Sequence, residues 1–211
     1  MSEENKKSSF KIFAVIAVVV IAVVVIVLGI IYKFTIGTYN TIVDLDENVS
    51  SAWSQVENQY QRRLDLIPNL VNSVKAYAKH EDSLFTQLAE ARSKLGGVVN
   101  IDASITSDPQ KFAEYQKIQG ELSSGLQRLM AISENYPELK ANQNFLALQD
   151  ELAGTENRIS TERKRFNDSA KTYNSYIRKF PQSIIAERKG FEKKAYFEAD
   201  STASKAPVVQ F

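Results

Sequence analysis

The strongest pattern in the chain is an unbroken apolar run near its N-terminus. Residues 12–32 read IFAVIAVVVIAVVVIVLGIIY and contain no charged side chain. About 20 apolar residues cross the hydrocarbon layer as a helix, and a helix is expected there because lipid offers no partners to open backbone groups. A signal peptide has a shorter apolar region, about 7–15 residues, followed by a small-residue cleavage site. This run is longer and continues into Lys33, so it predicts an uncleaved transmembrane helix.

Beyond this run, apolar residues recur every three or four positions, the period of an amphipathic helix. The stripe comprises Ile42, Leu45, Val49, Ala52, Val56, Tyr60, Leu64, Ile67, Val71 and Val74. Trp53 widens it and is interpreted as a core residue, the alternative being an exposed interface anchor. Gly37 alone weakens a helix by only about 1 kcal/mol. One helix is therefore predicted to run from the bilayer into the soluble part.

Pro68 interrupts this helical pattern. It lacks an N–H and crowds the preceding turn, so a helix that contains it kinks or breaks near Ile67. The apolar stripe nevertheless resumes in phase at Leu70, Val71 and Val74. We therefore predict a bend that keeps one face of the helix against the same core.

Three further amphipathic segments follow. The first covers residues 80–95 and stops at Gly96 and Gly97, and residues 96–108 are predicted to form a surface loop. The next helix is predicted to start at residues 107–110, with Ser107 and Gln110 at capping-box spacing and a proline just inside.

The last amphipathic segment begins around Pro137 and runs to Pro181. Two positions on its stripe, Thr155 and Arg163, are polar. Arg163 is expected to lay its stem on the core and send its head to water, the alternative being a buried ion pair. Asn167 lies among aromatic and basic residues, and the sequence alone does not explain it.

These patterns predict an all-α protein, in which an N-terminal transmembrane helix is followed by an antiparallel four-helix bundle with a long kinked first helix. The predicted parts are a polar tail (1–11), the transmembrane helix (12–32), the helical bundle (33–181) and a C-terminal tail that is partly packed (182–211).

The charges that flank the apolar run indicate its orientation. Lys6, Lys7 and Lys11 precede the run, and only Lys33 follows it closely. Because basic residues favour the cytoplasmic side, the N-terminus is predicted to be cytoplasmic and the bundle extracytoplasmic, on a bacterial cell membrane.

Composition excludes several classes of protein. The 211-residue chain has no Cys, so disulfides, thiolate zinc sites and Cys nucleophiles are excluded. Three of its 26 basic and two of its 25 acidic residues lie in the polar tail, which leaves 23 of each sign beyond it. A nucleic-acid-binding protein is expected to carry a basic excess, so no nucleic-acid partner is predicted.

The sequence contains no recognisable catalytic, cofactor or metal motif. The single histidine, His80, is followed four residues later by Leu84 and not by the second histidine that a zinc-protease helix needs. A di-iron bundle site would need two Glu-x-x-His pairs. Neither a G-x-S-x-G nucleophile elbow nor a P-loop occurs. We predict a protein that is not an enzyme and has no cofactor.

Two groups of charged residues are candidates for other roles. Arg62, Arg63 and Asp65 form a compact cluster before the bend, which is either a solvated face or a docking surface for a partner protein or anionic headgroups. Asn157 and Arg158 are predicted to form hydrogen bonds between helices, the alternatives again being a solvated face or a docking surface.

The chain also resembles the LemA family. The matching residues are Tyr39-Asn40, AWSQVENQYQRRLDLIPNLV at 52–71, Ala78-Lys79-His80-Glu81 and Ala91-Arg92, followed by Tyr136-Pro137-Glu138-Leu139-Lys140, Leu152-Ala153-Gly154-Thr155-Glu156-Asn157-Arg158-Ile159, Glu162-Arg163, Phe166-Asn167, Tyr173-Asn174, Phe180-Pro181, Gly190-Phe191 and Tyr196-Phe197-Glu198-Ala199. The resemblance covers nearly everything after the apolar run. It implies one membrane span followed by a mostly helical antiparallel bundle, and no established catalytic activity.

The resulting hypothesis is a membrane-anchored scaffold or adaptor for other membrane or envelope proteins, held in the bilayer by residues 12–32. Membrane attachment raises its effective concentration toward such partners. A self-assembling structural element is the alternative, since Ala14 and Ala17 permit close helix packing without a full small-xxx-small pattern. An enzyme with an unrecognised site is the least favoured hypothesis.

Overall fold

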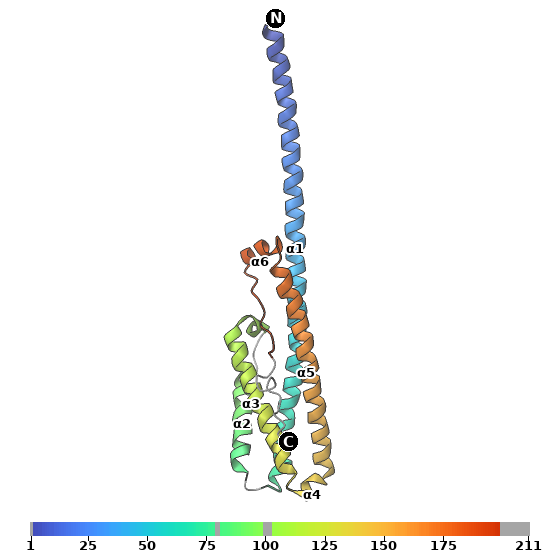
Figure 1. The fold of residues 1–211 in the computed structure, drawn as a ribbon, viewed down its shortest axis with the longest axis vertical. Coiled ribbons are helices and arrows are strands. Elements are labelled where there is room, and N and C mark those ends of the chain that lie inside the picture. The colour runs from blue at the N-terminus through green and yellow to red at the C-terminus, as the bar shows by residue number, and fades with distance from the viewer. Residues whose placement is uncertain (1, 79–80, 99–102, 199–211) are drawn as a thin grey trace, which may run out of the picture.

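The computed structural model describes residues 2–78, 81–98 and 103–198, and their regular elements are all helices (Figure 1). The predicted all-α class is therefore confirmed. The elements are α1 (Ser2–Lys75), α2 (Asp82–Val98), the 3₁₀ helix η1 (Ala103–Ser107), α3 (Pro109–Ser133), α4 (Pro137–Lys140), α5 (Gln143–Ile177) and α6 (Gln182–Lys189). The long helices α1, α2, α3 and α5 alternate in direction, with α1 packed along α5 and α2 along α3.

Helix α1 is a single rod of 74 residues that projects far beyond the bundle (Figure 1). In its projecting part, residues 15–31, the large apolar side chains are between 47% and 66% exposed. The helix contains an 18-residue window with a mean hydropathy of 3.4, none of it buried. This exposed apolar surface has the length and composition of a membrane span, as predicted. We call residues 12–32 the stem.

Helix α1 enters the bundle without a break and continues through Pro68 to Lys75. Ile67, Leu70 and Val74, on either side of the proline, are all at most 2% exposed. The apolar face therefore keeps its phase across Pro68, as the stripe predicted. The bend itself stays a prediction.

Two later helix starts differ from the sequence prediction. The cap of α3 is Asp108 and not Ser107, because the Asp108 carboxylate accepts the backbone N–H groups of Gln110 and Lys111 at 3.0 and 3.1 Å. A helix does begin at Pro137, but it is the four-residue α4 and not the predicted long helix. The last long helix starts at Gln143, where Asn142 accepts two backbone N–H groups.

The segment predicted as a surface loop is more ordered than expected. Helix α2 includes Gly96 and Gly97 and ends at Val98, and the 3₁₀ helix η1 follows at residues 103–107. Ile105 and Thr106 of η1 are 5% and 1% exposed, so this part is core. Residues 99–102 of the predicted loop lie outside the described residues.

An aromatic cluster centred on Trp53 fills the middle of the bundle. The Trp53 ring lies 5.7–6.1 Å, centroid to centroid, from four aromatic rings on other parts of the chain: Phe112, Tyr115, Phe166 and Phe197. Trp53 is 1% exposed. The core interpretation of Trp53 is confirmed, and the cluster joins α1, α3, α5 and the segment after α6.

Candidate functional site

The predicted charged cluster on α1 divides into one buried and two exposed residues. Arg62 pairs with Glu151 of α5 at 2.9 Å, and both side chains are exposed. Asp65 accepts a hydrogen bond from Gln61 one turn earlier and is also exposed. Arg63, in contrast, is 1% exposed. Both interpretations of the cluster, a solvated face and a docking surface, are therefore wrong for Arg63, because its side chain turns inward along the apolar stripe.

Arg63 joins three helices through its guanidinium group. Nη1 donates to Ser123 Oγ of α3 at 2.7 Å and to Glu156 Oε1 of α5 at 2.9 Å. Nη2 donates to the side-chain and backbone oxygens of Gln119. The planar fork of arginine suits such multiple bonding. One buried charge thereby fixes α3 and α5 relative to α1.

The buried surroundings of Arg63 include two tyrosines. The guanidinium carbon of Arg63 lies 5.1 Å from the centre of the Tyr60 ring, a cation–π distance. Burial raises the pKa of Tyr60, and the charges of Arg163 and Arg63 act in the opposite direction. Burial also raises the pKa of Tyr115. Both phenols therefore remain neutral near pH 7, and their rings pack against each other in the core.

A polar cleft of about 540 Å³ opens beside Arg63, between α3 and α5. Its ionisable lining comprises Tyr60, Arg63, Lys117, Glu156, Arg163 and Glu198. The three basic groups and the two carboxylates nearly balance, and Glu156 already pairs with Arg63. The cleft thus has mixed charge.

Arg163 also reaches the segment that follows α6. Its guanidinium carbon lies 4.6 Å from the centre of the Phe197 ring, and Nη2 donates to the Glu198 carbonyl at 3.1 Å. The side chain is half-buried. No ion pair forms between Arg163 and another described residue. The guanidinium head, expected to lie in water, therefore contacts Phe197 and Glu198 instead.

Residues 191–198, which we call the strap, run back along α5 without regular secondary structure (Figure 1). Asn174 donates to the Lys194 carbonyl at 2.8 Å and accepts the Lys194 N–H at 2.9 Å. Asn167 makes the same pair of bonds with Phe197, both at 2.9 Å. Each amide thus binds one backbone unit as a neighbouring β-strand would.

The spacing of these two asparagines matches the strap. Seven helical residues from Asn167 to Asn174 rise about 10 Å, and three extended residues from Lys194 to Phe197 span about 10 Å. The strap is further bound by the Lys194–Asp46 ion pair at 2.8 Å and by the N–H of Ala195, which donates to Thr106 at 2.7 Å. Asn167, unexplained by the sequence, therefore anchors the C-terminal part of the fold.

This arrangement predicts the effect of removing one amide. Asn174→Ala leaves the Lys194 N–H and C=O without their partners, and we expect it to lower the free energy of unfolding by about 1–3 kcal/mol. Limited trypsin digestion should also cut faster after Lys193 and Lys194. Asn157→Ala is the matched control, because Asn157 is exposed on the same helix. Equal digestion rates for the two variants would contradict this role.

The hydrogen bonds between helices that were predicted for Asn157 and Arg158 do not form in the described structure. Asn157 and Arg158 are both exposed, and among the described residues neither side chain forms a hydrogen bond to another helix. The inter-helix hydrogen bonds of α5 come from Glu151 and Glu156 instead. His80 lies outside the described residues.

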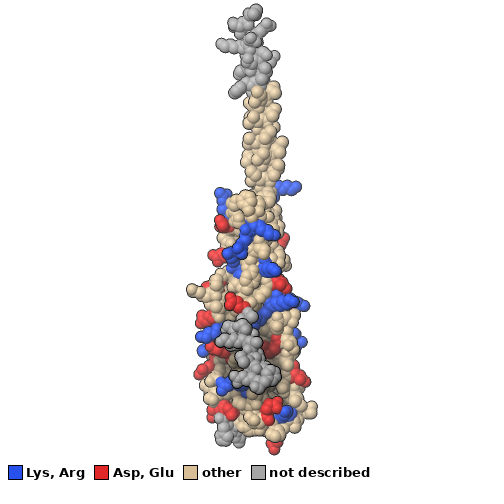
Figure 2. Space-filling view, in the orientation of Figure 1, with Lys and Arg blue, Asp and Glu red and all other residues tan. Residues whose placement is uncertain are grey.

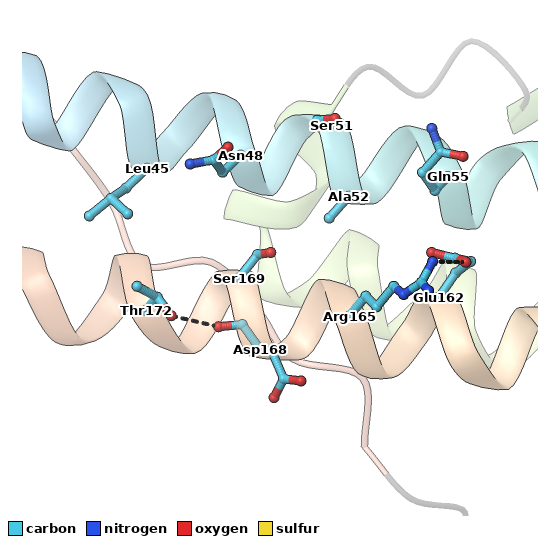
Figure 3. Close-up of a pocket in the computed structure, with 10 residues that line it drawn as sticks. All are labelled: Leu45, Asn48, Ser51, Ala52, Gln55, Glu162, Arg165, Asp168, Ser169 and Thr172. Carbon is cyan, nitrogen blue, oxygen red and sulfur yellow. Dashed lines mark hydrogen bonds and ion pairs between the residues drawn. The ribbon is translucent and has the colours of Figure 1, made fainter.

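A groove runs along the seam between α1 and α5 (Figure 3). The groove has a volume of about 520 Å³, and small or amide side chains line much of it: Asn48, Ser51, Ala52, Gln55, Ser169 and Thr172. Arg165 pairs with Glu162 at its edge, at 2.7 Å. A neighbouring hollow of about 590 Å³ shares Leu45, Asp168 and Thr172 and extends to Lys179. Within the described residues, no group of three potential metal ligands occurs.

A sequence model of the LemA family matches residues 52–211, which is well over half of the chain. The chain belongs to the LemA family. The resemblance found in its motifs is thereby confirmed.

Several curated relatives of this LemA-family chain have names. Magnetosome protein MamQ of Magnetospirillum gryphiswaldense is 30% identical over 189 residues, covering 81% of this chain and 68% of that protein. Magnetosome protein MamQ 1 of Paramagnetospirillum magneticum is 29% identical over 189 residues, which again cover 81% of this chain and 68% of that protein. Protein LemA of Metamycoplasma hominis is 26% identical over 172 residues, covering 82% of this chain and 74% of that protein. None of these names states an enzymatic reaction. Together with the exposed apolar helix, they support a membrane protein.

Proposed function

We propose that this LemA-family chain is a non-enzymatic scaffold or adaptor, which holds its bundle at a fixed height above a bacterial cell membrane for other membrane or envelope proteins. The proposed orientation is a cytoplasmic N-terminus and an extracytoplasmic bundle, supported by the three lysines that precede the stem.

The observation that carries this proposal is the continuity of α1. The same helix supplies the exposed apolar stem and the buried face of the bundle, from Ile42 to Val74. Because an α-helix rises 1.5 Å per residue, Ile42 lies about 15 Å beyond Tyr32. With no flexible linker between stem and bundle, the height of the bundle is built into the sequence.

The groove along α1 and α5 is the surface to probe for partners, because it runs along the helix that sets this height. A photo-cross-linking residue at Ser51, in the groove (Figure 3), should capture the same membrane or envelope proteins in repeated preparations from intact cells. The matched control is the probe at Glu90, exposed on α2, and its captures define the background. Capture of a second copy alone would favour the self-assembling alternative.

Height is tested by lengthening α1. Inserting one heptad between Ile36 and Gly37, both exposed, raises the bundle by about 10 Å and turns it by only about 20°. We expect the probe at Ser51 to stop cross-linking these proteins, while the chain still integrates into the membrane and keeps its helix content. Unchanged captures would contradict a fixed-height scaffold.

Orientation has its own test. The natural chain has no Cys, so Glu138→Cys at the far end of the bundle introduces a single thiol. A membrane-impermeant maleimide should label it in intact cells. Labelling only after the cells are broken would contradict the proposed orientation.

A further inference from the structure

The end of the bundle nearest the stem is closed by the end of α5, by α6 and by the turn into the strap (Figure 1). We call residues 178–191 the membrane-side cap. Gly190, with a φ of 75°, ends α6 and turns the chain toward the strap. The Phe191 ring lies 5.9 Å from that of Tyr39, and Lys189 Nζ lies 5.6 Å from the Tyr39 ring centre. These contacts fix the cap against α1.

Within the described residues, the cap exposes two large apolar side chains, Phe180 and Ile184. Phe180 is 81% exposed, the highest value for a large apolar residue in the part of the chain with described side chains. Ile184, on α6, is 49% exposed. Most exposed large apolar residues with described side chains belong to the stem, where lipid would cover them. The cap lies beside α1, at the end of the bundle from which that stem projects (Figure 1).

The cap is also basic. Arg178, Lys179, Arg188 and Lys189 are exposed there, while Glu187 is its one acidic residue. Lys33 is exposed on the adjoining part of α1, and Glu192 is exposed just beyond the cap. Lys and Arg side chains accordingly gather near the end of the bundle from which the stem emerges (Figure 2).

The distance from the cap to the bilayer is short. Tyr39, which the cap contacts, lies seven residues or about 10 Å beyond Tyr32 along α1. The headgroup layer on each side of the hydrocarbon is about 5–7 Å thick. The remaining few ångströms are within the reach of a phenylalanine, lysine or arginine side chain.

We propose that the membrane-side cap binds the anionic lipid headgroups of the bilayer that the stem crosses. Basic residues attract anionic headgroups, and exposed apolar side chains beside them insert at the boundary with the acyl chains, as in interfacial helices. Since the cap lies to one side of α1, this binding sets the direction in which the stem tilts. Transmembrane helices tilt by about 20° on average.

The test uses the full chain in lipid nanodiscs with Phe180→Trp as the probe. The wild-type chain is a built-in control, because its single tryptophan, Trp53, is buried about 30 Å beyond the stem. In discs that contain phosphatidylglycerol, a lipid with a nitroxide on its headgroup should quench the fluorescence of the introduced indole and leave the fluorescence of Trp53 unchanged. In discs of phosphatidylcholine alone, the quenching should fall.

A charge variant separates binding from mere proximity. Each basic residue near an anionic surface contributes about a fivefold factor, so adding Arg188→Gln and Lys189→Gln should lower the ratio of bound to unbound cap by about 30-fold. The matched control is Lys94→Gln with Lys164→Gln, exposed lysines outside the cap, which should leave the quenching unchanged. Absence of quenching, or quenching that ignores both lipid charge and the cap variant, would overturn the proposal.

Discussion

Replacing Trp53 by alanine should destabilise the bundle more than any other single substitution considered for this chain. The ring contacts four other aromatic rings from three further parts of the chain, and it is 1% exposed. Removing a buried aromatic side chain loses its transfer free energy and leaves a cavity, which together cost about 3–5 kcal/mol. We expect a loss of this size in the free energy of unfolding of Trp53→Ala, measured by far-UV circular dichroism on the full chain in detergent.

The matched control is Phe180→Ala, which removes an aromatic ring that is 81% exposed. Exposed substitutions usually change stability by no more than about 0.5 kcal/mol. Similar losses for Trp53→Ala and Phe180→Ala would contradict the aromatic cluster as the centre of the core.

Arg63→Ala should cause the second largest loss in the free energy of unfolding, and the adjacent Arg62 supplies the control. The substitution removes hydrogen bonds to Ser123, Gln119 and Glu156 and leaves a cavity between three helices. Because Glu156 is partly exposed and can be rehydrated, we expect a loss of about 3 kcal/mol, at the lower end for breaking a buried ion pair.

Arg62→Ala breaks an ion pair whose two side chains are 51% and 40% exposed. Such exposed pairs contribute about 0–1 kcal/mol. Thermal or denaturant unfolding of the two variants side by side compares adjacent residues of one type and charge. If the loss for Arg62→Ala equalled that for Arg63→Ala, the buried network would not join the helices as described.

The difference between these two arginines also shows how far the sequence could predict the site. Position 63 lies three residues after Tyr60 and four before Ile67, so its spacing placed it on the apolar stripe. Its charge suggested the surface instead. Which interpretation holds depends on Ser123, Gln119 and Glu156, which lie 56 to 93 residues away, and local spacing does not reveal such distant partners.

The strap illustrates the same limit. Asn167, Ala170, Asn174 and Ile177 are spaced by threes and fours, which places both amides on the core-facing side of α5. That spacing was a usable signal. Their partner, the strap, has no periodicity of its own, however. The sequence therefore predicted only that the C-terminal tail is partly packed. Residues 199–211 of that tail lie outside the described residues.

The stem and the helical stripes, in contrast, followed from periodicity alone, because lipid and a bundle core each demand a continuous apolar surface. Helix ends were harder, since neighbouring polar residues compete for the same backbone groups. Ser107 and Asp108 are adjacent candidates, and the carboxylate of Asp108 caps α3.

One continuous helix, α1, connects the membrane stem to the bundle. The most direct test places spin labels at Lys33→Cys and Asn58→Cys in the full chain, which has no other Cys, and measures their separation in nanodiscs by double electron–electron resonance. Twenty-five helical residues predict a narrow distribution centred near about 38 Å. A broad distribution, or one centred well below that distance, would show a flexible joint and contradict a rigid connection between stem and bundle.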